Sequence, residues 1–197
     1  MVKLGVTGGI GSGKSYVCRL LSEEFDIPVY NCDIHARIIT LTDIDVVQSL
    51  SQLIEGVYDS DGELDKQRLA SYLFASAEHA AQVNAIIHPA VRRDLHEWLQ
   101  RFSDEPVVAI ESAILYESGF QDEVDRVLFV DASQETRVRR VVARDGLSPD
   151  EVLHRMQSQR PDDARRRADF CLMNDDDSHP AEQLREILRL LNLEIIQ

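Results

Sequence analysis

Residues 8–15, Gly-Gly-Ile-Gly-Ser-Gly-Lys-Ser, complete the pattern G-x-x-x-x-G-K-[ST], which limits the possible folds more than any other feature of the chain. A β-prone run, Lys3 to Thr7, precedes this stretch, and helical spacing of apolar residues follows over 14–25. In such a turn the backbone N–H groups and the positive end of the next helix form a cradle for phosphate groups. The pattern predicts a site for a purine nucleoside triphosphate; the alternative is a glycine-rich turn with an incidental lysine.

The chemistry of phosphate binding gives each part of this stretch a role. The amine of Lys14 is expected to reach the β- and γ-phosphates, and the hydroxyl of Ser15 is expected to take one Mg²⁺ position. The predicted nucleotide-binding residues are those of the loop and the residue after it: Gly8, Gly9, Ile10, Gly11, Ser12, Gly13, Lys14, Ser15 and Tyr16.

Short apolar runs separated by helical segments predict an α/β fold with a parallel sheet. Besides Lys3 to Thr7, the expected strands are Pro28–Tyr30, Val107–Ile110, Val127–Val130 and Phe170–Met173. Helices are expected over 135–144 and 180–191, and Ser148 is expected to cap another helix that begins at Pro149. Two helical insertions, at about 34–103 and 136–167, interrupt the predicted sheet.

Two carboxylates follow predicted strands at the sheet edge where open α/β folds bind ligands. Asp33 follows the run 28–30, where it is expected either to accept a hydroxyl proton or to cap a helix that starts near Ile34. Glu111 ends the run 107–110. It is expected either to meet Mg²⁺, directly or through water, or to lie in solvent.

Charge is spread unevenly along the chain. The net charge of −14 argues against non-specific binding to DNA or to an anionic membrane. The segment 137–167, however, carries nine arginines against five acidic residues. Arg140 and Arg144 share one helical face and are candidates to contact a triphosphate, with a solvated helical face as the alternative. His88 precedes Pro89 in an apolar context, where a lone histidine more often has a structural role.

The three cysteines form no C-x-x-C pair, and no apolar run approaches the length needed to cross a bilayer. Free thiols are typical of a reducing compartment, so a cytoplasmic protein is expected.

The motifs of this chain resemble those of the dephospho-coenzyme A kinases nearly from end to end. Residues 4–15 are similar to the phosphate loop of that family, including the Thr-Gly-Gly-Ile start, and residues 28–37 are similar to the stretch that holds its catalytic aspartate. Asn84 to Pro89 matches the Asn-x-Ile-x-His-Pro signature. Further similar segments are 114–117, the lid arginines of 140–144, Arg155 with Gln159, and Ala168-Asp169 with Asn174.

This resemblance implies a three-layer P-loop NTPase fold with a parallel sheet of about five strands. It also implies ATP-dependent phosphorylation of the ribose 3′-hydroxyl of dephospho-coenzyme A, the last step of coenzyme A synthesis. The implied nucleotide-binding core comprises 1–33, 104–135 and 168–197, with a substrate-binding insertion at 34–103 and a lid at 136–167.

The resemblance also distributes roles among the candidate residues. Asp33, Lys14 and Arg140 would be catalytic. The nucleotide contacts outside the loop would come from Arg140, Arg144 and Asn174, and the substrate contacts from Asp33, His88 and Glu111. ATP, Mg²⁺ and dephospho-coenzyme A are the implied ligands, with no nucleic acid and no membrane as a partner.

The chain departs from the usual family residues at a few positions. Asn31-Cys32 stands in place of Asp-Ala, Tyr16 in place of a frequent threonine, and Ala113 in place of proline. None of these changes removes a group that the chemistry needs. Two rival functions are a kinase for shikimate or nucleoside monophosphates, and a nucleotide switch without efficient transfer. Asp33, the insertion and the arginine-rich lid favour transfer over a switch.

Overall fold

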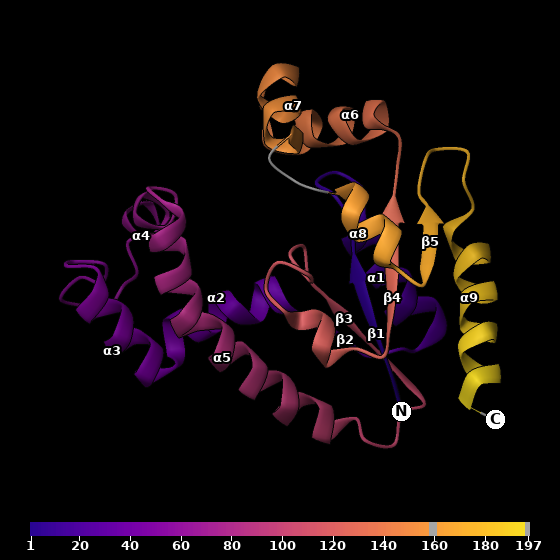
Figure 1. Cartoon of the computed structure of the whole chain (residues 1–197), viewed down its shortest axis with the longest axis horizontal. Coiled ribbons are helices and arrows are strands. Elements are labelled where there is room, and N and C mark those ends of the chain that lie inside the picture. The colour runs from indigo at the N-terminus through magenta and orange to yellow at the C-terminus, as the bar shows by residue number, and fades with distance from the viewer. Residues whose placement is uncertain (158–160, 196–197) are drawn as a thin grey trace. The chain divides into compact units, whose positions relative to one another are not determined.

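The computed structural model describes residues 1–157 and 161–195 (Figure 1). Its contacts divide the chain into two compact units, one of Met1–Tyr30 with Phe102–Gln197 and the other of Asn31–Arg101. We call the first the sheet unit and the second the helical unit. Gln159, which the sequence comparison paired with Arg155, lies outside the described residues.

The sheet is built from five strands: β1 (Val2–Thr7), β2 (Val29–Asn31), β3 (Val107–Glu111), β4 (Arg126–Asp131) and β5 (Phe170–Met173). Their spatial order is β2-β3-β1-β4-β5. The central strand β1 pairs in parallel with β3 and β4, and β4 pairs in parallel with β5. The predicted α/β fold with a five-stranded parallel sheet is therefore confirmed, and the glycine-rich stretch follows its central strand.

Helices α1 (Lys14–Phe25) and α9 (Pro180–Ile195) pack on one face of this sheet. Alternate residues of β1 and β4 point into that core, where they meet apolar side chains of both helices: Leu4, Val6, Leu128, Val130, Val17, Leu21, Leu184 and Leu191. On the other face, Leu115 and Val124 pack close to Gly5 of β1. Because both faces are covered, the inner strands read as continuous apolar runs instead of alternating ones.

The outer edge of β5 is closed by a side chain instead of a sixth strand. The amide of Gln183, on α9, accepts a hydrogen bond from Met173 N at 3.0 Å and donates one to Met173 O at 2.9 Å. Gln183 thus satisfies the peptide groups that a neighbouring strand would otherwise bind.

Helices α6 (Gln134–Asp145), α7 (Pro149–Gln157) and α8 (Pro161–Arg167) lie between β4 and β5 in the chain. The predicted cap at Ser148 is confirmed. Its Oγ accepts from Glu151 N at 3.3 Å, while the Glu151 carboxylate accepts from Ser148 N at 2.8 Å. This reciprocal arrangement fixes the start of α7.

The helical unit comprises α2 (Cys32–Thr42), α3 (Ile44–Leu53), α4 (Lys66–Leu73) and α5 (Ala77–Arg101). The long helix α5 packs against the other three. Pro89 lies inside α5, where its missing N–H removes one helical hydrogen bond. In the described parts of the chain, no helix is long and apolar enough to cross a membrane.

Asn31, not Asp33, caps α2. The helix begins at Cys32, and Asn31 Oδ1 accepts a hydrogen bond from Ile34 N at 2.9 Å. The expectation that Asp33 caps a helix near Ile34 is therefore wrong. The extended backbone at the end of β2 places the side chain of Asn31 where it reaches the third amide of the helix. Asp33 lies exposed in the first turn, and its carboxylate is not used as a cap.

Asp43 provides a pH-dependent link within the helical unit. It caps α3 by accepting from Val46 N at 3.1 Å, and it accepts from Arg93 Nη2 of α5 at 2.8 Å. The hydrogen bond from Val46 has the largest effect on the pKa of Asp43 and lowers it; burial comes next and raises it, and the hydrogen bond and charge of Arg93 lower it further, so that the pKa stays below its usual value. The ionised form is therefore favoured in the folded state, and its contribution to stability is lost as the pH falls through the folded pKa.

We expect Asp43→Asn to lower the free energy of unfolding at pH 7 by about 0.5–1 kcal/mol, because asparagine keeps the cap but loses the ion pair. The difference from the parent should shrink as the pH falls below about 4, where the parent carboxylate also becomes protonated. Urea unfolding at pH 7 and pH 3 measures both values. Asp45→Asn, on the same helix, is the matched control, and an equal Asp43→Asn deficit at the two pH values would contradict the assignment.

Candidate active site

The stretch 8–15 forms a tight loop between β1 and α1. Gly11 and Gly13 have φ angles of 78° and 89°, in the left-handed region that favours glycine. A Cβ atom at Gly11 would lie 2.6 Å from the carbonyl oxygen of Arg137, and one at Gly13 would collide with the side-chain amide of Asn174. The loop therefore needs glycine both for its turns and for the close approach of its neighbours.

Lys14 folds back over this loop. Its Nζ donates to Gly8 O at 2.9 Å and lies 3.5 Å from Gly9 O. The amine is thus held beside the loop at the amino end of α1, where the helix dipole also favours an anion. The position agrees with a role in binding phosphate oxygens.

Donors from distant parts of the sheet unit hold the loop by its carbonyl groups. Arg137 Nε donates to Ile10 O at 2.9 Å, and Asn174 Nδ2 donates to Ser12 O at 2.8 Å. Arg140 Nη1 lies 3.5 Å from the same Ser12 oxygen. Helix α6 and the segment after β5 therefore meet at the loop, and they bring the predicted residues Arg140 and Asn174 to it.

Arg137 was not among the residues predicted from the sequence, although it makes the shortest contact between α6 and the loop. It lies three residues before Arg140, so both side chains emerge from neighbouring positions on α6. That spacing is the signal that would have found it. By contrast, Arg144 donates hydrogen bonds to its neighbour Asp145. Its Nε and Nη2 lie 2.7 and 2.9 Å from the two carboxylate oxygens.

Asp176 holds the charged groups of Arg139 and Arg140. Its Oδ2 lies 2.5 Å from Arg139 Nη2, and its Oδ1 lies 3.7 Å from Arg140 Nη2. The guanidinium of Arg140 is therefore shared between the Asp176 carboxylate and the loop.

Glu111, at the end of β3, is hydrogen-bonded to Ser15 at the start of α1. Ser15 Oγ donates to Glu111 Oε1 at 3.3 Å, and Glu111 is only 5% exposed. The alternative that Glu111 lies in solvent is therefore wrong. One turn along α1, the thiol of Cys18 has a raised pKa, chiefly because it is buried and secondly because of the Glu111 charge. Cys18 therefore stays protonated beside the pair.

The donor set of this pair suits Mg²⁺. A hydroxyl and a carboxylate oxygen are the hard ligands that Mg²⁺ prefers, and it takes most of its other ligands from water and substrate phosphates. Among the described residues, no group of three or more His, Cys, Asp or Glu side chains could hold a metal alone. In addition, Ser12 Oγ, in a residue only 1% exposed, has no hydrogen-bond partner within the described residues.

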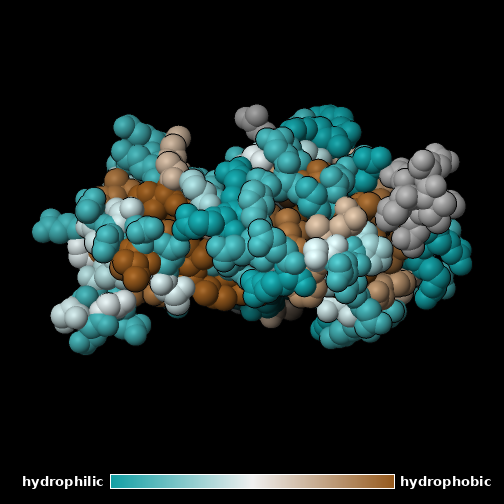
Figure 2. All heavy atoms as spheres, turned by 90° about the horizontal axis from the view of Figure 1, so that it is seen from below, coloured by the Kyte–Doolittle hydropathy of each residue, from teal (hydrophilic) through white to brown (hydrophobic). Residues whose placement is uncertain are grey.

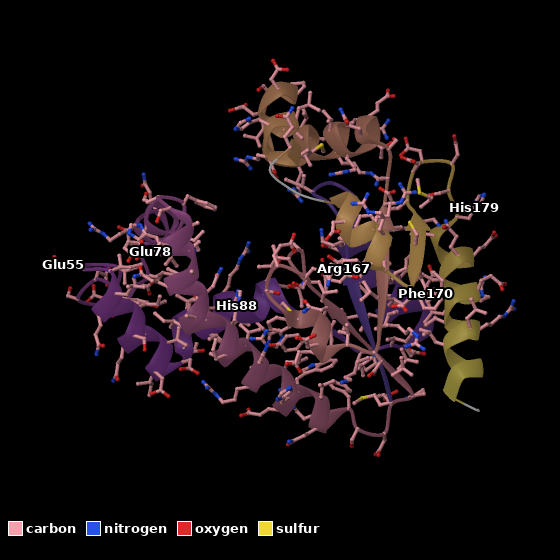
Figure 3. The ribbon with its side chains drawn as sticks, viewed as in Figure 1. Glu55, Glu78, His88, Arg167, Phe170 and His179 are labelled. Carbon is pink, nitrogen blue, oxygen red and sulfur yellow. The ribbon has the colours of Figure 1, made fainter. Side chains whose placement is uncertain are left out.

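The remaining predicted residues lie elsewhere. Tyr16 is 41% exposed, and the guanidinium of Arg19 lies 5.4 Å from its ring centre. In the helical unit, His88 is half-buried on α5 (Figure 3), where burial and the charge of Arg92 lower its pKa. It is therefore neutral at pH 7. Asp33 is exposed at the start of α2 in the same unit.

The last turn of α8 is held in the sheet unit by two further arginines. Arg167, labelled in Figure 3, lies 4.0 Å over the ring of Tyr116, and Arg165 Nη1 lies 3.1 Å from Asp131 at the end of β4. These contacts position α8 beside the carboxyl end of the sheet.

A parallel sheet whose central strand enters a glycine-rich loop, with a lysine over the loop and a hydrogen-bonded Ser–Glu pair beside it, defines a P-loop kinase. A family model described as dephospho-CoA kinase matches residues 2–179. The chain belongs to the dephospho-CoA kinase family. The predicted family and enzyme class, a kinase that transfers phosphate to a hydroxyl acceptor, are confirmed.

Curated relatives agree over nearly the full length. A dephospho-CoA kinase of Bacteroides fragilis strain YCH46 is 42% identical over 191 residues, covering 96% of this chain and 93% of the relative. A dephospho-CoA kinase of Corynebacterium diphtheriae is 37% identical over 185 residues, covering 92% of each.

Solved structures show the same fold. The crystal structure of TT1252 from Thermus thermophilus has a TM-score of 0.84 at 36% identity, covering 96% of this chain and 97% of that one. A dephospho-CoA kinase from Campylobacter jejuni has a TM-score of 0.64 at 20% identity, covering 95% of each chain. A shikimate kinase from Bacteroides thetaiotaomicron has 0.56 at 16%, covering 97% and 98%. The last two likenesses concern the fold alone.

Proposed function

We propose that this chain transfers the γ-phosphoryl group of ATP to the ribose 3′-hydroxyl of dephospho-coenzyme A. The observation that carries the proposal is the family match over residues 2–179, which includes both the phosphate loop and Asp33. In this proposal, residues 34–103 hold the acceptor and residues 136–167 act as a lid over ATP.

The loop side of the mechanism follows from the contacts described above. Lys14 would exchange the carbonyl oxygens of Gly8 and Gly9 for phosphate oxygens, and Arg140 would exchange Asp176 for them. Both cations would then stabilise the charge that spreads over the transferred group. Ser15 and Glu111 would hold Mg²⁺, which would neutralise charge on the β- and γ-phosphates when bound.

Asp33 would act on the acceptor. The 3′-oxygen forms a bond to the γ-phosphorus while the bond from that phosphorus to the bridging oxygen breaks and ADP leaves. The hydroxyl proton passes to the Asp33 carboxylate and then to solvent. Asp33 is exposed and is not the helix cap, so its oxygens are available for this proton.

The proposal also covers the remaining predicted contact residues and the cellular compartment. Arg144 and Asn174 would contact ATP, and His88 would contact the acceptor. Arg144 would first have to leave Asp145. Cys18, Cys32 and Cys171 are free thiols, which supports the proposal of a cytoplasmic protein.

The decisive experiment is mass spectrometry of dephospho-coenzyme A after incubation with the purified chain, ATP and MgCl₂. We expect a gain of one phosphate on the ribose 3′-oxygen, and no gain when EDTA removes the metal. Shikimate and nucleoside monophosphates serve as rival acceptors in parallel reactions. Phosphorylation of one of these instead, or ATP binding without transfer to any acceptor, would overturn the proposal.

A further inference from the structure

Helix α2 has one face that is exposed to solvent along its whole length. At 3.6 residues per turn, Asp33, Ile34, Arg37, Ile38 and Leu41 fall within about 140° of the helix circumference. All five are exposed, and the three aliphatic residues are 53%, 49% and 48% exposed in chain order. We call these five residues the α2 face. Figure 2 shows that hydrophobic residues, in brown, reach the surface of the molecule among hydrophilic ones.

The rest of the helical unit holds this face in place. The opposite side of α2 is buried, with Cys32 and Ile39 each 7% exposed, and the helix packs against α5. His35 Nδ1 lies 2.6 Å from Asp94 Oδ2 of α5, and Tyr58 Oη donates to Thr40 O at 2.6 Å. The α2 face is therefore a fixed surface that needs no rearrangement to receive a ligand.

The chemistry of this face changes in a definite order along the helix axis. It begins with the carboxylate of Asp33 and the neighbouring aliphatic side chain of Ile34. The cation of Arg37 follows about 6 Å beyond Asp33, and Leu41 ends the face about 12 Å from Asp33. Within the described chain, the Arg37 guanidinium has no ion pair, whereas Arg68 and Arg93 of the same unit pair with Asp65 and Asp43. The unit as a whole is acidic, with eleven acidic residues against six basic ones, so Arg37 is a local exception.

We propose that the α2 face binds dephospho-coenzyme A, with Arg37 on the 5′-diphosphate and with Ile38 and Leu41, which follow Arg37, along the pantetheine arm. This inference rests on the proposed function. The diphosphate is attached to the same ribose whose 3′-hydroxyl would meet Asp33. The negative charge of the diphosphate therefore lies within a few covalent bonds of the acceptor oxygen. The guanidinium fork suits phosphate oxygens. The methyl and methylene groups of the arm match the aliphatic residues that follow.

A second copy of the chain fits this face less well. A stable protein interface buries about 800 Å² on each partner, which three half-exposed aliphatic side chains do not supply. A charged pair, Asp33 and Arg37, also lies within the face, whereas the centres of such interfaces are depleted in charge. A flexible substrate arm with an anionic group needs only a narrow strip of this kind.

The first test is Arg37→Gln, which removes the charge and keeps much of the side-chain length. We expect the KM for dephospho-coenzyme A to rise about tenfold or more, because a charge-assisted contact to phosphate is lost. The inhibition constant of adenosine, which lacks the diphosphate and competes for the acceptor site, should stay within about twofold of the parent value. Arg101→Gln, at the exposed end of α5, is the matched control and should behave as the parent.

The second test is Leu41→Ser, matched by Leu190→Ser on α9, since these two leucines are 48% and 51% exposed. Loss of apolar contact with the arm should raise the KM for dephospho-coenzyme A about fivefold in Leu41→Ser and leave it unchanged in Leu190→Ser. Gel filtration of the parent and both variants shows whether the face instead joins two copies.

The outcomes separate the two proposals. A parent enzyme that does not phosphorylate dephospho-coenzyme A removes the proposed function. A parent that does, with Arg37→Gln indistinguishable from Arg101→Gln, overturns the role of the α2 face alone. A rise in the adenosine constant equal to the rise in KM, or a change of oligomeric state in Leu41→Ser at unchanged KM, would also overturn it.

Discussion

Asp33→Asn is expected to lower kcat for dephospho-coenzyme A about 10²-fold or more, while the KM for ATP stays almost unchanged. The substitution replaces a carboxylate that can accept the 3′-hydroxyl proton with an amide that cannot. Because Asn31 provides the cap of α2, the change should leave the helix intact. Steady-state kinetics with each substrate varied in turn separates the two parameters.

Two controls test whether a fall in kcat reflects the loss of the Asp33 carboxylate and not a damaged fold or a general effect of this type of substitution. Thermal unfolding of Asp33→Asn should match the parent, which shows that the fold is retained. Asp61→Asn, in an exposed turn of the same unit, makes the same chemical change away from the predicted site and should keep the parent kcat. A parent-like kcat in Asp33→Asn would remove Asp33 from the mechanism.

Lys14→Ala is expected to affect both binding and turnover. The amine lies within 3.5 Å of two loop carbonyl groups, and it is the cation expected to meet the β- and γ-phosphates. Its loss should raise the KM for ATP and lower kcat, with a combined fall in kcat/KM of about 10²–10³-fold. The same assay, with ATP as the varied substrate, measures both effects.

The chain contains only two other lysines, and one of them offers a matched control. Lys66→Ala removes the same charge from the exposed first turn of α4 and should leave the kinetics unchanged. If Lys14→Ala behaved like Lys66→Ala, the assignment of residues 8–15 as a phosphate loop would be wrong.

Most of the fold was predictable because its elements carry local signals. The apolar run at 107–110 predicts β3, since a parallel strand covered on both faces has no exposed side to alternate with. The helix over 14–25 follows from the spacing of Val17, Leu20 and Leu21, all of which are buried. Ser148, Pro149 and Glu151 predict the start of α7 because a capping box lies within one turn.

The site was less predictable, because its contacts join residues far apart in the chain. Glu111 lies 96 positions from Ser15, and no local pattern shows that its carboxylate is buried against that hydroxyl. Arg137 lies 127 positions from Ile10. The prediction that Asp33 caps α2 was wrong for a different reason. Asn31 and Asp33 are both good capping residues, and only the backbone at the end of β2 decides between them.

The pairing of Gln183 with Met173 has a consequence for the behaviour of the protein at high concentration. A bare terminal strand presents peptide groups that recruit strands from other molecules, which is a common route to aggregation. Here one amide side chain occupies both groups of Met173 at the outer side of β5. The sheet is thereby protected from edge-to-edge growth at this position by a single side chain of α9.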